Sequence, residues 1–268
     1  MLLLLPLLLL VAAIIGSFVE ARRSPYAFAM GRVISNTFSA IGGAPLALFG
    51  ASALLSVPMQ LVMLFRAPAV YDADRLVATG SSASPLSLLI LLLYPMVSLF
   101  MAGIAVDTLA GRPVDPGATL RMALRRALPA IAMFLLFGIA LFVGFALLVV
   151  PAVALLVTWF VVVPVMAAEG RGPLECFGRS SQLMRGTRWR LLLLLVIVAL
   201  LWLVAGLLVQ GPVFLLVGAS DGWTGAVVRA VFGTLTGVLP ATGTAAVYHE
   251  VRTAKEGAGD RDLASVFA

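Results

Sequence analysis

The stretch LPAIAMFLLFGIALFVGFALLVVPAVALLVTWFVVVPVMAA, residues 128–168, contains no charged residue in 41 consecutive positions. A helix needs about 20 apolar residues to cross a hydrocarbon core about 30 Å thick, so this stretch is too long for one span and suits two. The Gly and Pro residues between Gly144 and Pro151 mark the expected turn. The stretch therefore predicts two adjacent membrane-spanning helices.

The rest of the chain has the same character. Of its 268 residues, 62% are hydrophobic and 11% are charged, whereas a soluble domain has roughly 45–50% apolar and about 25% charged residues. We therefore predict an all-α, polytopic transmembrane helical bundle with a six-helix core. The four other candidate spans of this core are residues 44–65, 85–105, 191–217 and 223–248.

The N-terminal segment, residues 1–25, has three interpretations. Its apolar run, residues 1–19, lacks the preceding basic residues of a secretory signal, and Arg22 and Arg23 follow it. The run is a seventh helix with its N-terminus outside, an atypical signal or anchor, or the product of a mis-annotated start, with translation beginning near Met30. We assign residues 26–250 to the six-helix membrane domain and residues 251–268 to a short cytoplasmic tail.

The basic residues are distributed on one side of this arrangement. With six spans, 15 of the 18 Lys and Arg residues fall in the loops and tail of a single side. Because cytoplasmic loops are enriched in Lys and Arg, we predict that both ends of the core are cytoplasmic. The expected location is the inner (plasma) membrane of a bacterium, with a cytoplasmic C-terminus. The net charge of +6 therefore reflects which loops lie in the cytoplasm, and we expect no nucleic-acid partner.

Each basic loop also shows the periodicity of an amphipathic helix. In the first, Arg32 is expected on a polar face, opposite Met30 and Val33. In the third, Pro173 can open a helix, Gly186 can end it in a left-handed turn and Thr187 can cap the next span. Basic helices of this kind lie at the headgroup level and favour anionic lipid, so we predict membrane lipids with anionic headgroups as partners. Three units of similar pattern result: residues 26–110, 112–168 and 172–248.

Two sets of residues are candidate lipid- or anion-binding sites. The first is the loop cluster Arg179, Arg185, Arg188 and Arg190. It acts either as a topology anchor or as a site for lipid headgroups or a partner. The second is Arg229, which lies inside the last span.

Arg229 shares a helix face with small residues spaced by four: Gly225, Gly233, Gly237 and Ala241. Small residues at this spacing allow close approach of a neighbouring helix. One interpretation is a packing seam, with Arg229 reaching outward or pairing with Asp221. The other is a buried Arg that binds a lipid phosphate or an anionic solute.

No catalytic, metal or cofactor site is expected. The chain lacks phosphate-loop, nucleophile-elbow and zinc-protease motifs, and Cys176 and His249 are the single residues of their types. Within the spans, prolines are expected to kink their helices. These are Pro58, Pro95, Pro164 and Pro240.

The third basic loop, PVMAAEGRGPLECFGRSSQLMRGTRWR (residues 164–190), resembles the bacterial glycerophosphoryl diester phosphodiesterase membrane-domain family. The segments FAMGRVISNTFSAI (28–41) and AAVYHEVRTAKEG (245–257) are similar to its start and end. The matching residues are Pro164, Glu169, Arg179, Ser180, Leu183, Gly186, Tyr248, Arg252 and Gly257. The resemblance implies a multi-helix membrane module without the fused catalytic barrel.

These observations favour a membrane module without catalytic machinery, structural or lipid-interacting in role. The alternative is a transporter or permease-like subunit for a lipid-like or small solute, motivated by the proline-interrupted spans and Arg229. We do not expect an enzyme.

Overall fold

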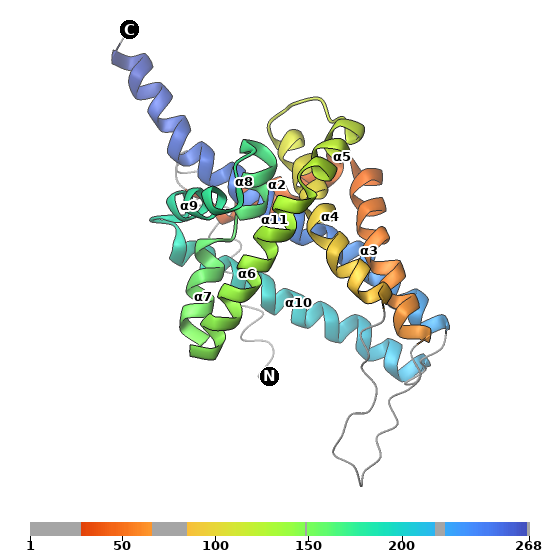
Figure 1. Cartoon of the computed structure of the whole chain (residues 1–268). Coiled ribbons are helices and arrows are strands. Elements are labelled where there is room, and N and C mark those ends of the chain that lie inside the picture. The colour runs from red at the N-terminus through yellow and green to blue at the C-terminus, as the bar shows by residue number, and fades with distance from the viewer. Residues whose placement is uncertain (1–27, 66–84, 148, 218–222, 267–268) are drawn as a thin grey trace.

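Helices make up the regular structure of the residues that the computed structural model describes, which are 28–147, 149–217 and 223–266 without 66–84 (Figure 1). The predicted N-terminal helix in residues 1–25 lies outside these residues. The described helices are α2 (Met30–Gly43), α3 (Pro45–Phe65), α4 (Pro85–Leu109), α5 (Pro116–Arg125), α6 (Ala127–Leu147), α7 (Val149–Thr158), α8 (Val162–Glu169), α9 (Pro173–Met184), α10 (Arg188–Val217) and α11 (Trp223–Val266).

Six stretches in the described part of the chain are helical, long and apolar enough to cross a membrane. This finding confirms the all-α class and the six predicted core helices, and it is compatible with a multi-pass membrane protein. The stretches are Pro45–Val62, Leu88–Leu109, Ala127–Leu147, Val149–Glu169, Arg188–Leu208 and Gly225–Glu256.

A short helix precedes a pair of longer helical segments three times along the chain: α2 before α3 and α4, α5 before α6 and α7–α8, and α9 before α10 and α11. The start of α5 shows why these short helices form. Pro116 occupies its first turn, and the carboxylate of Asp115 accepts hydrogen bonds from the N–H groups of Gly117 and Ala118 at 2.9 and 3.1 Å. Proline and an aspartate cap together satisfy the open end of a helix.

The fourth span is broken in the middle. Helix α7 ends at Thr158, and α8 begins at Val162. Pro164 explains the position, because proline lacks the N–H that would donate to the fourth preceding carbonyl, and its ring collides with that carbonyl. The hydroxyl of the fully buried Ser180 in α9 donates to the carbonyl of Thr158 at 3.0 Å. A side chain from another helix thus satisfies a carbonyl at the break.

The other three prolines, Pro58, Pro95 and Pro240, lie inside helices that continue through them. That they kink these helices stays a prediction. A proline in a membrane helix is tolerated where neighbouring groups satisfy the released backbone.

The segment assigned to the C-terminal tail is helical as far as Val266. Residues 251–266 continue α11 without interruption, so the last span and the segment after it form one helix.

Small residues set the helix spacing at two contacts. A Cβ atom on Gly237 of α11 would collide with the Oγ of Ser52 in α3, and one on Gly233 would lie 3.2 Å from the Cβ of Ser56. A Cβ on Gly144 of α6 would lie 3.0 Å from the Cα of Ala152 in α7. Glycine is therefore required where α11 meets α3 and where α6 meets α7.

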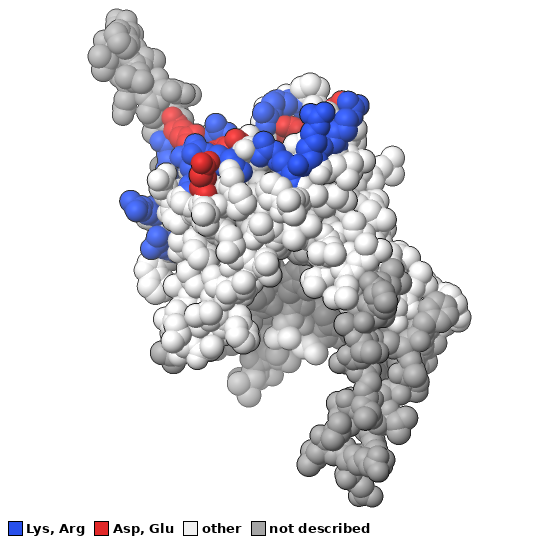
Figure 2. Space-filling view, in the orientation of Figure 1, with Lys and Arg blue, Asp and Glu red and all other residues white. Residues whose placement is uncertain are grey.

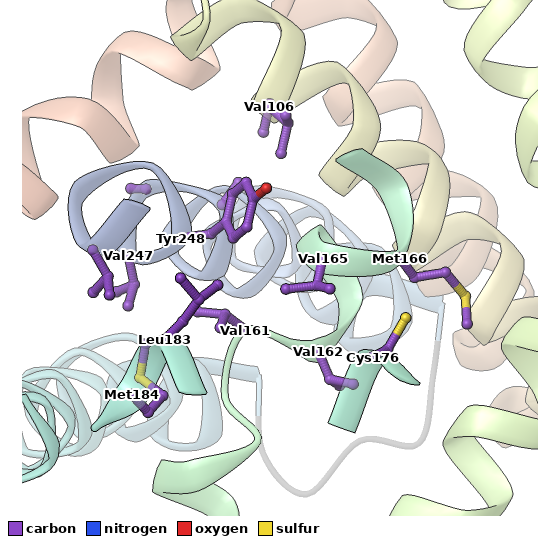
Figure 3. Close-up of a cluster of buried hydrophobic side chains, with 14 of the residues drawn as sticks. Val106, Val161, Val162, Val165, Met166, Cys176, Leu183, Met184, Val247 and Tyr248 are labelled. Atoms are coloured by element: carbon purple, nitrogen blue, oxygen red, sulfur yellow. The ribbon is translucent and has the colours of Figure 1, made fainter. Parts of the chain in front are cut away.

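The main cluster of buried side chains joins α8, α9 and α11. The cluster includes Val165 and Met166 of α8 and Leu183 and Met184 of α9, and Figure 3 shows Met166 close to Cys176. Tyr248 of α11 is 2% exposed in the same cluster. This packing brings together polar groups at the adjoining ends of three helices.

Candidate functional site

Charged side chains gather at one end of the described bundle, over α5, α9 and the second half of α11 (Figure 2). We call this the basic end. One of its most buried charges is Glu169, the last residue of α8, whose side chain is 11% exposed. Gly170 follows in a left-handed conformation, with φ of +66°, and turns the chain toward α9.

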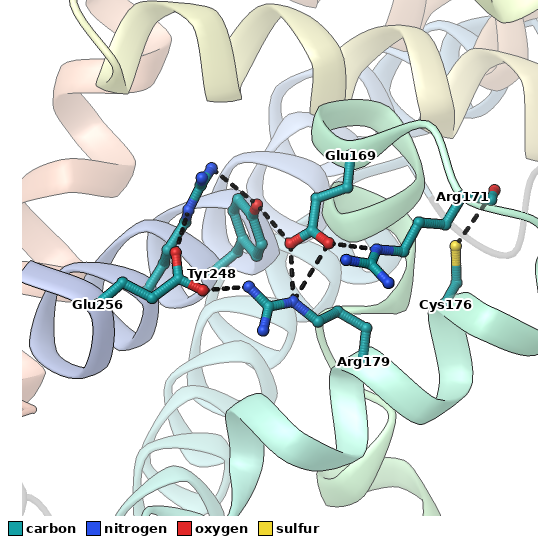
Figure 4. A network of polar contacts seen from close by, with 7 residues as sticks. Glu169, Arg171, Cys176, Arg179, Tyr248 and Glu256 are labelled. Atoms are coloured by element: carbon teal, nitrogen blue, oxygen red, sulfur yellow. Dashed lines mark hydrogen bonds and ion pairs between the residues drawn. The ribbon is translucent and has the colours of Figure 1, made fainter. Parts of the chain in front are cut away.

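Glu169 is the centre of a polar network (Figure 4). Its carboxylate accepts hydrogen bonds from Nε of Arg171 at 2.7 Å, from Nε of Arg179 at 3.0 Å and from the hydroxyl of Tyr248 at 3.2 Å. Arg179 also pairs with Glu256 of α11. Burial lowers the pKa of Arg179, but the hydrogen bonds that it donates to Glu256 and Glu169 outweigh this effect and leave the pKa raised.

The second half of α11 is tied to α9 by Lys255. Within α11 itself, Arg252 donates to Glu256 at 2.7 Å and to the Tyr248 hydroxyl at 3.2 Å. The ammonium of Lys255 donates to the carbonyls of Gln182 and Arg185 at 2.9 and 2.7 Å. A cation at the C-terminal carbonyls of a helix is electrostatically favourable. The network therefore locks α8, α9 and α11 together.

A separate ion pair joins α11 to the start of α2. Glu250, which is 4% exposed, accepts from Nε of Arg32 at 2.8 Å and from the backbone N–H of Ala29 at 3.1 Å. Ala29 has no side-chain oxygen to cap α2, so the carboxylate from α11 fills that role. Arg32, which the sequence placed on a polar helix face, lies beside this buried carboxylate.

The four arginines of the predicted loop cluster have different surroundings. Arg179 belongs to the network, and Nη1 of Arg190 donates to the carbonyl of Phe28 at 3.3 Å. Arg185 and Arg188 are exposed, and no carboxylate of the described residues lies within ion-pair distance of either. The hydroxyl of Thr187 donates to the Met184 carbonyl at 3.3 Å, so it closes α9, where we had expected a cap for α10.

A groove with three arginines lies on α5. It has a volume of about 390 Å³ and is lined by Ala118, Arg121, Met122, Arg125 and Arg126. Within the described parts of the chain, no carboxylate is within ion-pair distance of these three arginines. The guanidinium of Arg126 lies against the turn that follows α8, where a Cβ on Gly170 would come within 2.6 Å of Nη2. We call this feature the α5 groove.

A larger cavity lies between α3, α4 and α11 on one side and α6, α7 and α8 on the other. Its volume is about 660 Å³. The lining is mainly apolar and aromatic, with Trp159 and Phe160 contributed by the break between α7 and α8. The polar lining residues are Ser52, Ser56, Gln60, Tyr94, Ser98 and Thr244. We call it the central cavity.

Arg229 lies beside the central cavity. Its Nε donates to Oε1 of Gln60, a lining residue, at 3.2 Å. Asp221, the pairing partner considered in the sequence, lies outside the described residues. On the same face, Gly225 is buried and Ala241 is 8% exposed.

Cys176 is buried and unsuited to chemistry. Its Sγ is 3.6 Å from the carbonyl of Arg171, and burial raises its pKa to about 11. His249 is half-buried. Across the residues that the structure describes, no group of three or more His, Cys, Asp or Glu could hold a metal ion.

Comparison with protein families identifies one match. Residues 116–251, just over half of the chain, match a domain of unknown function, DUF7847. The chain belongs to the DUF7847 family. No curated protein and no solved structure matches the chain. Nothing in the DUF7847 match links the chain to the phosphodiesterase membrane domain, so that resemblance stays a prediction.

The DUF7847 region contains most of the features above. It begins at the first residue of α5 and includes the α5 groove, Glu169, Arg179 and Arg229, but it excludes Arg252 and Glu256. Sequence reasoning predicted that this loop forms a basic amphipathic helix that favours anionic lipid, but it did not name the groove arginines as a site. Their spacing on α5 was the available signal, whereas the central cavity has no counterpart in the periodicity of any one helix.

Proposed function

We propose that the chain is a non-catalytic, lipid-interacting membrane module that holds anionic lipid headgroups at its basic end. The observation that carries this proposal is the α5 groove. Three arginines line it without a carboxylate partner among the described residues, and guanidinium groups bind phosphate well because they offer several donors in a planar fork.

The position of the groove supports this function. Arg125 is the last residue of α5 and Arg126 is its C-cap, and α6, a candidate span, begins at the next residue. An arginine next to the end of a span lies at headgroup depth. Each Lys or Arg near an anionic membrane surface contributes about 1 kcal/mol of attraction. In this proposal the basic end faces the cytoplasm of a bacterium.

The test is lipid-dependent stability of the full chain in nanodiscs. Replacing the phosphatidylcholine with phosphatidylglycerol should raise the melting temperature of the wild type. Arg121→Gln/Arg125→Gln should remove most of that increase, because about 2 kcal/mol of attraction is lost.

The matched control is Arg112→Gln/Arg171→Gln. It removes the same charge from the same end, but these arginines are paired with Asp107 and Glu169 at 2.8 and 2.7 Å. The lipid-dependent increase should survive in this variant. Equal loss in both double variants, or no dependence on phosphatidylglycerol in the wild type, would contradict the proposal.

A second candidate is a transporter or permease-like subunit, which the central cavity between six helices favours. Solute uptake that is unchanged by Arg229→Ala and by deletion of the gene would remove this alternative. Orientation is tested separately: a reporter fused to the C-terminus should report a cytoplasmic location.

A further inference from the structure

Arg229 and the central cavity together form a site that is separate from the α5 groove. We propose that the central cavity binds a single-chain anionic amphiphile, such as a fatty acid, with its chain among the apolar lining and its charged head on the guanidinium of Arg229. The head is a carboxylate or a phosphate, since both accept two parallel hydrogen bonds from a guanidinium.

The depth of Arg229 fits a headgroup contact. Arg229 is 19 residues before Tyr248 on the same helix, which is about 28 Å along the axis at 1.5 Å per residue. Tyr248 belongs to the network at the basic end. Since a hydrocarbon core is about 30 Å thick, Arg229 lies near the opposite membrane surface, where the head of an amphiphile would be.

The hydrogen bonding of Arg229 leaves donors for such a head. Only Nε donates to Gln60, and no carboxylate among the described residues is within ion-pair distance of the guanidinium. Both terminal nitrogens therefore have N–H groups for an anion. Arg229 is half-buried, and a guanidinium beside protein gains more from a counter-ion than one in water, because the effective dielectric there is lower.

The shape of the cavity fits one hydrocarbon chain. Along α11 its lining runs from Gly233 to Thr244, about 16 Å at the helical rise. A methylene group is about the size of a water molecule, whose share of liquid volume is about 30 Å³, so the 660 Å³ cavity holds about 20 such groups. This matches one long acyl chain and is too small for the two chains of a phospholipid.

The cavity contains its own reporter. Trp159 lines it, and the other three tryptophans of the chain, Trp189, Trp202 and Trp223, do not. The full chain with these three changed to phenylalanine, in phosphatidylcholine nanodiscs, is titrated with dibromostearate, whose bromine atoms quench a nearby indole. We expect saturable quenching of Trp159 by dibromostearate and much weaker quenching by its uncharged methyl ester.

Arg229→Gln should raise the half-saturating concentration of dibromostearate about tenfold or more, because hydrogen bonds to charged groups are strong. Arg229→Lys should retain part of the affinity. Arg112→Gln, which removes an exposed charge that is paired with Asp107 at the basic end, is the control and should change nothing. A dibrominated lysophosphatidate titrated in parallel shows whether carboxylate or phosphate is preferred, and tighter binding of either than of the methyl ester supports the proposal.

Val163→Phe provides an independent test, because Val163 lines the cavity and the larger ring would occupy part of it. Quenching should weaken while far-ultraviolet circular dichroism stays unchanged. Equal quenching by the acid and the methyl ester, or unchanged affinity in Arg229→Gln, would overturn the proposal. These readouts do not involve the α5 groove, so their failure leaves the headgroup function standing, and the reverse also holds.

Discussion

Glu169→Gln is the substitution that tests the polar network most directly. The change preserves the shape of the side chain and removes its charge. Arg179 would then keep Glu256 as its carboxylate partner, and Arg171 would lose its ion pair. We expect the variant to fold with lower stability, because two cations and the Tyr248 hydroxyl share this one carboxylate.

The expected cost follows from the burial of the partners. Breaking a buried ion pair costs about 3–5 kcal/mol, but exposed pairs contribute at most about 1 kcal/mol. Glu169 is 11% exposed, whereas the Arg179 and Arg171 side chains are 21% and 47% exposed. The network therefore lies between the two limits, and we expect a loss of about 2 kcal/mol in the free energy of unfolding.

The assay is reversible unfolding in mixed micelles, followed by circular dichroism. A double-mutant cycle with Arg179→Gln should give a coupling energy of about 1–2 kcal/mol, since the two side chains are in direct contact. Glu175→Gln is the control: Glu175 is exposed in the first turn of α9 and should cost less than about 1 kcal/mol. A Glu169→Gln variant as stable as the wild type, or no coupling to Arg179, would refute the reasoning.

Two further outcomes are expected. Gly237→Val should destabilise the bundle by about 1–3 kcal/mol in thermal unfolding, because the new side chain collides with Ser52. Gly243→Val on the same helix is the control, since a Cβ there meets nothing within 4 Å. Its stability should stay close to that of the wild type. Cys176 should resist maleimide at pH 7 in the folded protein and react rapidly after denaturation. Burial raises the pKa of its thiol to about 11, so the folded thiol stays protonated until strongly alkaline pH. Rapid labelling of the folded chain at pH 7 would contradict this burial.

The six core helices could be predicted from the sequence because a span needs only a long apolar run without charge, which is a local property. Whether a given proline breaks its helix could not be predicted from the sequence. Pro58 and Pro164 look alike in sequence, yet the helix continues through one and breaks at the other. At the break, the Thr158 carbonyl bonds to Ser180, which lies 22 positions further along the chain.

The candidate sites were harder to predict, because they are built from contacts between residues that are far apart in the sequence. Glu169 and Tyr248 both stood in the motifs that carry the family resemblance, but their meeting across 79 positions is a property of packing. The same holds for Arg229 and Gln60, which are 169 positions apart. Composition and periodicity identify which helices exist and leave open which side chains they bring together.

The ion pairs divide the arginines of the basic end into two kinds. Those held by carboxylates, such as Arg32 and Arg179, add little to the electric field felt by a membrane, because each is largely cancelled by its neighbour. Arg121, Arg125 and Arg188 have no such compensation among the described residues. The count of basic residues that orients the chain during insertion is therefore larger than the charge that remains to attract lipid once the chain has folded.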